Sequence, residues 1–212
     1  MQGTKVQKNA VLMCVILASM LDVGIGAMSK EEWRKTKHNC SNNDKSACQA
    51  LIDSGLPSVK QCNKDDCSFV GVVYYQMERY TEAIPYFEKA IALGDSREYF
   101  LLGLVYYDLQ DYAKKYYKIG CSKINNFQSA SCVGLATMYQ KEKIYRKVRK
   151  LYKKSCDMKN GVACANLAFY YKDGVGVKQN QSIAKKYYGK ACDLGEQLAC
   201  DNYKLLQNQG TE

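Results

Sequence analysis

The residues of this chain that could do covalent chemistry are its cysteines, 11 in a sequence of 212 residues. Two C-terminal stretches each hold two cysteines eight positions apart, "SCDMKNGVAC" with Cys156 and Cys164, and "ACDLGEQLAC" with Cys192 and Cys200. A spaced pair written twice, 36 residues apart, predicts the same structural feature at the same place in a repeated unit.

The N-terminal segment decides what chemistry the cysteines do. Lys5 and Lys8 precede an apolar run at 10–21, and small residues follow it. This is the layout of a secretory signal peptide, and the run is too short to span a bilayer. We therefore expect a signal peptide at 1–26 and a protein that is secreted or periplasmic. An uncleaved N-terminal anchor is the alternative.

Outside the cytosol cysteines oxidise, so a paired set indicates a disulfide framework. Removal of the signal removes Cys14 and leaves an even set: Cys40, Cys48, Cys62, Cys67, Cys121, Cys132, Cys156, Cys164, Cys192 and Cys200. The expected pairs are neighbours in sequence, although exchange among the first four stays open. Zinc is disfavoured because His38 is the single histidine and no C-x-x-C occurs. We expect no metal and no cofactor.

One serine and lysine pair has a spacing used in hydrolysis. Ser182 and Lys185 form an S-x-x-K, the nucleophile motif of serine β-lactamases, but the K-T-G and S-D-N elements of those enzymes do not follow. Ser182 also stands where a helix should begin, so its simplest role is that of an N-cap. The catalytic residues are therefore unknown, and free thiols are used up by pairing.

The elements that position the cysteines repeat with a regular step. Four segments align at steps of 30, 35 and 36 residues: "AIPYFEKAI" (83–91), "AKKYYKIGC" (113–121), "VRKLYKKSC" (148–156) and "AKKYYGKAC" (184–192). Four others lie between or before them: "CSFVGVVYY" (67–75), "YFLLGLVYY" (99–107), "CVGLATMYQ" (132–140) and "CANLAFYYK" (164–172). Apolar residues recur in them at helical spacing, so each unit is a helix pair and the units stack into a solenoid.

The repeat explains the cysteine spacing. One cysteine ends a helix, the other begins the next, and the two sulfurs meet across the corner. A bridge that closes so short a loop stabilises by about 2–3 kcal/mol in the chain-entropy model. The longer corner between Cys121 and Cys132 has the same plan. At the equivalent places 91 and 99 the chain has Ile91 and Tyr99, where an apolar contact is expected instead.

The stretch "AKKYYGKACDLGEQLAC" resembles the Sel1-like repeat, a relative of the tetratricopeptide repeat. With the export signal and the spaced cysteines, the chain resembles the Helicobacter cysteine-rich proteins over about residues 29–206. The resemblance implies an all-α fold, a right-handed α/α solenoid with a disulfide in each repeat. It divides the mature chain into a helical cap at 27–60 and a repeat solenoid at 61–212. It also implies two functions: a binding scaffold, or a β-lactamase that hydrolyses penicillin-type or cephalosporin-type β-lactams.

By the same resemblance, the helices that begin with the cysteine line a concave groove for an extended ligand. The residues expected to face a ligand there are Tyr75, Arg97, Phe100, Leu104, Tyr107, Thr137, Asn166, Phe169 and Lys172. Inter-helix packing is the alternative role for each. The tyrosines one position before the last of each helix, Tyr74, Tyr106, Tyr139 and Tyr171, are expected only to pack. The implied partner is a peptide or protein, including a cell-wall peptide or a β-lactam, bound by a monomer without a membrane span.

The net charge of +10 falls to +9 without the signal. A basic exported protein is drawn to anionic cell-wall polymers, acidic glycans or acidic proteins. Nucleic acid is not an expected partner, because no aromatic and basic motif of a known nucleic-acid module is present. The basic run at 146–154, "RKVRKLYKK", is most simply the solvated face of a helix.

Overall fold

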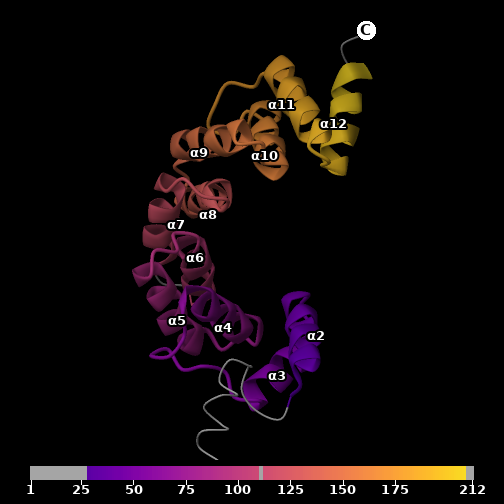
Figure 1. Cartoon of the computed structure of the whole chain (residues 1–212). Coiled ribbons are helices and arrows are strands. Elements are labelled where there is room, and N and C mark those ends of the chain that lie inside the picture. Colours follow the sequence, from indigo (N-terminus) through magenta and orange to yellow (C-terminus); the bar gives the residue numbers. More distant parts are fainter. Residues whose placement is uncertain (1–27, 110–111, 209–212) are drawn as a thin grey trace, which may run out of the picture. The chain divides into compact units, whose positions relative to one another are not determined.

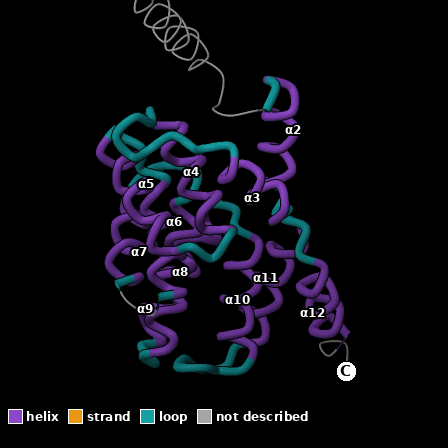
Figure 2. The backbone as a smooth tube through the Cα atoms, turned by 90° about the horizontal axis from the view of Figure 1, so that it is seen from below, coloured by secondary structure: helices purple, strands orange, loops and turns teal. Residues whose placement is uncertain are grey.

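The computed structural model describes residues 28–109 and 112–208, and the expected signal peptide lies outside them. Within these ranges every regular element is an α-helix and none is a strand (Figure 2). The predicted all-α fold built from helix pairs is confirmed.

The chain divides into two compact units, the first ending at Gly94 and the second starting at Asp95. Unit 1 contains α2 (Lys30–Ser41), α3 (Lys45–Asp53), α4 (Lys64–Gln76) and α5 (Tyr80–Ala92). Unit 2 contains α6 (Glu98–Asp108), α7 (Ala113–Ser122), α8 (Gln128–Lys141), α9 (Tyr145–Asp157), α10 (Gly161–Lys172), α11 (Gln181–Asp193) and α12 (Gln197–Asn208) (Figure 1). The division falls in the stretch between Cys67 and Cys121, which has no cysteine. The domain boundary expected at residue 60 stays a prediction.

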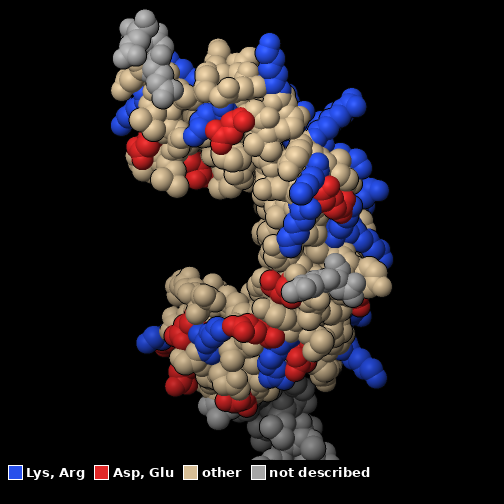
Figure 3. All heavy atoms as spheres, turned by 180° about the vertical axis from the view of Figure 1, so that it is seen from behind, with Lys and Arg blue, Asp and Glu red and all other residues tan. Residues whose placement is uncertain are grey.

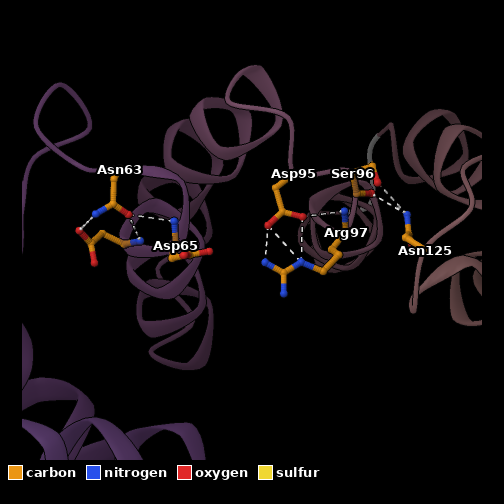
Figure 4. Close-up of polar contacts among 7 residues, drawn as sticks. Asn63, Asp65, Asp95, Ser96, Arg97 and Asn125 are labelled. Atoms are coloured by element: carbon orange, nitrogen blue, oxygen red, sulfur yellow. Dashed lines mark hydrogen bonds and ion pairs between the residues drawn. The ribbon is translucent and has the colours of Figure 1, made fainter.

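Side-chain caps explain where several helices begin. Ser29 and Glu32 form a capping box at α2, and Asn63 accepts the N–H groups of the next helical turn at α4 (Figure 4). At α11 the predicted cap is wrong. Asn180 accepts from the Ile183 N–H at 2.9 Å, so Ser182 lies inside the first turn. Asparagine caps a helix as well as serine does, and Asn180 comes first in the chain.

Three of the corners between pairs share one backbone conformation, whereas α7 ends in extended backbone at Lys123. Gly94, Lys159 and Gly195 have φ values of 93°, 63° and 92°, the left-handed region that ends helices. Each donates its N–H to the carbonyl three residues earlier at 2.9 Å. After Lys159 the chain reverses, and Asn160 caps α10 by accepting from the Ala163 N–H at 2.9 Å. This reversal places the end of one helix beside the beginning of the next.

All ten cysteines among the described residues form disulfides between sequence neighbours. The pairs are Cys40–Cys48, Cys62–Cys67, Cys121–Cys132, Cys156–Cys164 and Cys192–Cys200, with Cα–Cα distances of 4.7, 5.2, 4.7, 4.7 and 4.6 Å. The expected corner pairs are confirmed, and the first four cysteines pair as neighbours. Four bridges join adjacent helices, and Cys62–Cys67 joins the preceding loop to the first turn of α4; the described residues have no bridge between distant repeats.

In two of the pairs an aromatic ring of the second helix packs on a glycine of the first. A Cβ added at Gly71 of α4 would lie 2.5 Å from the Phe87 ring of α5. In unit 2 the Tyr117 ring of α7 lies between two glycines, because a Cβ at Gly103 or Gly134 would approach it to 2.4 or 2.7 Å. Only glycine lets the backbones of α6 and α8 approach the ring this closely.

The tyrosines predicted to pack do so. They stack on aromatic rings of the paired helix in the pairs Tyr74–Tyr86, Tyr106–Tyr116 and Tyr171–Tyr187, with ring centroids 5.5, 4.9 and 6.2 Å apart. In the repeat formed by α8 and α9, Leu151 takes the place of the second tyrosine. There the Tyr139 ring contacts the ammonium groups of Lys114 and Lys147 at 4.5 and 4.6 Å from its centroid.

One buried tyrosine gives unit 2 a predicted sensitivity to alkali. Tyr170 is 3% exposed, and burial, followed by the neighbouring Tyr152 and Tyr145, raises its pKa to about 12. An unfolded tyrosine has a pKa of about 10, so the unfolded state releases this proton first as pH rises. Stability is therefore unaffected below about pH 10 and falls as pH rises from there toward 12.

We expect the melting temperature to drop between about pH 9 and about pH 11 and the drop to be smaller for Tyr170→Phe. Thermal melts followed by far-UV circular dichroism measure it. Tyr112→Phe, on a ring that is 65% exposed, is the matched control and should behave like the parent. An identical alkaline loss in Tyr170→Phe and the parent would assign the effect to other groups.

Candidate binding surface

The first helices of the pairs in unit 2 place one side chain per repeat in the same register. The fully or nearly fully buried leucines Leu102, Leu135 and Leu167 mark this register in α6, α8 and α10. Two positions further along each helix, and at the equivalent position of α12, stand Leu104, Thr137, Phe169 and Leu205. These four residues are called the first-helix row.

The first-helix row becomes more exposed toward the C-terminus. Leu104 packs on the core around Tyr117, and the half-buried Thr137 donates its hydroxyl to the Val133 carbonyl at 3.2 Å. Phe169 is 43% exposed and Leu205 is 60% exposed. Phe169 makes an edge-to-face contact with Tyr170, with centroids 5.9 Å apart, so its ring is held from one side only. The C-terminal half of the row therefore presents apolar surface to solvent.

Two predicted ligand-facing aromatic residues of α6 are tied to neighbouring helices. Phe100 stacks on Phe127 with centroids 5.4 Å apart and lies 6.2 Å from the Tyr117 ring centroid. Tyr107 packs on the same core, and the Lys141 ammonium lies 4.3 Å from its ring centroid. Both side chains therefore pack within unit 2, and contact with a ligand stays a prediction.

The predicted polar residues also have partners. The Arg97 guanidinium forms a two-pronged ion pair with the buried Asp95, whose Oδ1 also accepts the Arg97 N–H at 3.0 Å (Figure 4). Nearby, Asn125 donates to the carbonyl and the hydroxyl of Ser96 at 3.1 Å each. Arg97 therefore holds the corner at the start of α6 and brings little net charge.

The remaining three predicted residues are half-buried. Lys172 Nζ lies 3.9 Å from Asp173 Oδ1 at the end of α10, and Asn166 lies six positions before Lys172 on the same helix. Tyr75 belongs to unit 1, where its ring lies 5.6 Å from that of Tyr80. Eight of the nine predicted residues are thus in unit 2, and their role toward a ligand stays a prediction.

Leu205 was missed by the sequence analysis. Cys200 begins α12 as Cys164 begins α10, and the step of 36 residues carries Phe169 onto Leu205. This repeat step is the sequence signal that indicates Leu205 as the counterpart of Phe169.

The serine of the S-x-x-K motif and the single histidine of the chain are both exposed. Ser182 is exposed in the first turn of α11. His38 is exposed, with a ring nitrogen 3.1 Å from Asn42 Nδ2. Across 28–109 and 112–208, no group of three or more His, Cys, Asp or Glu side chains is placed to hold a metal ion.

None of the helices in the described part of the chain is long and apolar enough to cross a membrane.

Comparisons with known proteins agree with the repeat register. The Sel1 repeat family matches residues 70–95 and 161–196. No curated protein matches the chain significantly. Among solved structures, a protective antigen of uropathogenic Escherichia coli with an SLR fold has a TM-score of 0.60 at 19% identity, over 78% of this chain and 36% of that one.

Two further structures share the fold. A Sel1 repeat protein of Oxalobacter formigenes has a TM-score of 0.59 at 20% identity, over 68% of this chain and 62% of that one. The Cut9–Hcn1 hetero-tetramer of the APC/C has a TM-score of 0.52 at 16% identity, over 78% of this chain and 33% of the matched chain. This chain thus spans between about a third and three fifths of the chains it resembles. The chain thus contains two segments that match the Sel1 repeat, and it shares the α/α solenoid fold of these structures, with disulfides added at its corners.

Proposed function

We propose that this protein is an extracytoplasmic binding scaffold that holds an extended segment of a partner protein along the first helices of unit 2. The observation that carries the proposal is the first-helix row, which presents Phe169 and Leu205 to solvent at equivalent places in successive repeats. Exposed apolar side chains in a repeated register suit a peptide whose own side chains alternate between contact and solvent.

The partner's chemistry follows from the side chains beside the row. Phe169 offers an aromatic anchor, and Lys172, three positions later on the same helix, offers a cation beside Asp173. A segment with an apolar side chain followed by a carboxylate would use both. The fold also occurs in a chain of the Cut9–Hcn1 hetero-tetramer, where it is part of a protein assembly.

The five disulfides support a location outside the cytosol, secreted or periplasmic, where such bridges persist. The β-lactamase alternative has no supporting contact among the described residues. A nitrocefin assay on the oxidised protein, with Ser182→Ala alongside, tests that alternative directly.

The binding proposal is tested with peptides selected from a random display library on oxidised parent protein. We expect the selected peptides to bind Phe169→Ser more weakly than the parent by about 1–3 kcal/mol, because exposed aromatic anchors dominate such contacts. Isothermal titration calorimetry with a synthetic copy of the selected peptide measures the difference.

Ile124→Ser is the matched control. Ile124 is 95% exposed, lies in the same unit and is outside the first-helix row. It should leave the affinity unchanged. Equal weakening by both variants, or none by Phe169→Ser, would mean that the peptide binds elsewhere and that the proposed face is wrong.

A further inference from the structure

The net charge of the protein is confined to one unit. Residues 28–94 contain nine Lys and Arg and nine Asp and Glu, whereas residues 95–212 contain 20 and 11. Residues 28–94 are thus neutral, and unit 2 carries +9 of the total of +10. A charge asymmetry of this size between two parts of one chain indicates an anionic partner for the basic part.

Within unit 2 the excess positive charge lies on the second helix of each pair. The second helices α7, α9 and α11 carry twelve Lys and Arg and two Asp. The first helices α6, α8, α10 and α12 carry three Lys and three acidic residues. Lysine and arginine side chains gather on the side of the molecule where α7 and α9 lie (Figure 3). This face is distinct from the first-helix row.

The cations of the second helices follow the repeat register. Two positions before the buried tyrosines Tyr117, Tyr152 and Tyr188, the chain has Lys115, Lys150 and Lys186, at steps of 35 and 36 residues. All three lysines are exposed. These three residues are called the lysine row. In unit 1 the same register, two positions before the buried Phe87, holds Pro85.

Neighbouring cations in the second helices are partly engaged inside the protein. Lys114 pairs with Glu142 and Lys153 pairs with Asp157, while Lys154 donates to the Cys121 carbonyl at 2.8 Å. Arg149 donates to the Gly176 carbonyl. The described residues place no carboxylate within ion-pair distance of the lysine row. Lys115 Nζ lies 5.5 Å from the centroid of the Tyr116 ring, a contact that does not neutralise its charge, so the row keeps its positive charges for a partner.

We propose that the lysine row binds a linear polysaccharide that carries sulfate or carboxylate groups. One exposed lysine per repeat presents regularly spaced positive charge along the stack, which suits a polymer with regularly spaced anions. The lysine ammonium acts as a point charge and donates hydrogen bonds to sulfate and carboxylate alike. It does not need the planar, two-pronged arrangement of acceptor atoms that suits an arginine guanidinium.

Other polyanions fit this face less well. On the second helices of unit 2, as far as the structure describes them, exposed large apolar residues occur only at the ends, at the caps Tyr112, Ile144 and Leu194. The lysines are therefore not interleaved with an apolar stripe that would enter a membrane or hold a peptide side chain. Tyr116 and Tyr187 on these helices stack on tyrosines of the first helices, so the rings are engaged and do not offer a platform for nucleic-acid bases. A hydrophilic polymer needs neither feature.

The test measures binding of heparin and of polygalacturonate to the full oxidised protein by fluorescence anisotropy over a range of salt concentrations. The row variant combines Lys115→Gln, Lys150→Gln and Lys186→Gln. The control variant combines Lys123→Gln, Lys178→Gln and Lys204→Gln, three exposed lysines of unit 2 outside the row, and it removes the same net charge. A free-thiol assay and circular dichroism verify that both variants are folded and oxidised.

We expect the row variant to bind the polysaccharides on the order of 100-fold more weakly at low salt, and its affinity to depend less steeply on salt concentration. The control variant should stay within about threefold of the parent, because distant charges are screened. Equal weakening of both variants would mean that net charge alone attracts the polysaccharide, and it would overturn the lysine row as the binding site. Absence of parent binding at low salt would overturn it as well. Tighter binding of the parent to polyglutamate, to anionic phospholipid vesicles or to single-stranded DNA would overturn the assigned class of partner.

Discussion

We expect reduction of the five disulfides to unfold the protein in the absence of any denaturant. Each bridge joins cysteines that are five to eleven positions apart, four of them between adjacent helices and one between a loop and the start of α4. At about 2–3 kcal/mol for each bridge, their sum is on the order of 10 kcal/mol, which is comparable with the whole stability of a folded protein. A stack of repeats has few contacts between distant residues that could replace this stabilisation.

Far-UV circular dichroism of reduced and alkylated protein, compared with oxidised protein, measures the loss of helix. The double variant Cys156→Ser/Cys164→Ser is the control. It loses one bridge, should cost about 2–3 kcal/mol and should remain folded. A reduced and alkylated protein that melts within a few degrees of the oxidised one would show that the helix packing alone holds the fold.

Truncation of Leu167 destabilises the protein by about 2–5 kcal/mol. Leu167 is 1% exposed and packs in the cluster that joins α8 to α12, so Leu167→Ala leaves a cavity among α9, α10 and α11 that rigid neighbours do not refill. Guanidinium unfolding followed by circular dichroism measures the change in the free energy of unfolding.

Phe169→Ala is the matched control for this experiment. It lies two positions further along α10, on the opposite face, and exposed aromatic truncations cost much less, about 1 kcal/mol or below. The two variants should therefore separate stability from binding: Leu167→Ala lowers stability, and Phe169→Ala lowers affinity for a selected peptide. If Phe169→Ala were as destabilising as Leu167→Ala, the first-helix row would be part of the core.

The sequence alone was sufficient for the features that depend on local contacts. The bridge between Cys156 and Cys164 was predictable because both cysteines belong to one corner, where the helix ends and the next begins within a few residues. The stacked tyrosines, such as Tyr106 on Tyr116, were predictable for the same reason. Their helical periodicity and the repeat step specify which face turns to the paired helix.

Only the tertiary structure decided the features that depend on how helices approach one another. The sequence does not tell that Phe100 stacks on Phe127, that Asp95 neutralises Arg97, or that two glycines leave room for Tyr117. The sequence offers two good capping residues, Asn180 and Ser182, and does not decide between them. Asn180 is the cap because the chain becomes helical directly after it. The charges of the lysine row could be counted in the sequence. The tertiary structure shows that these lysines are exposed and that neighbouring cations form ion pairs. Packing divides each helix into a buried face and a solvent face, and burial depends on the whole stack rather than on a single repeat.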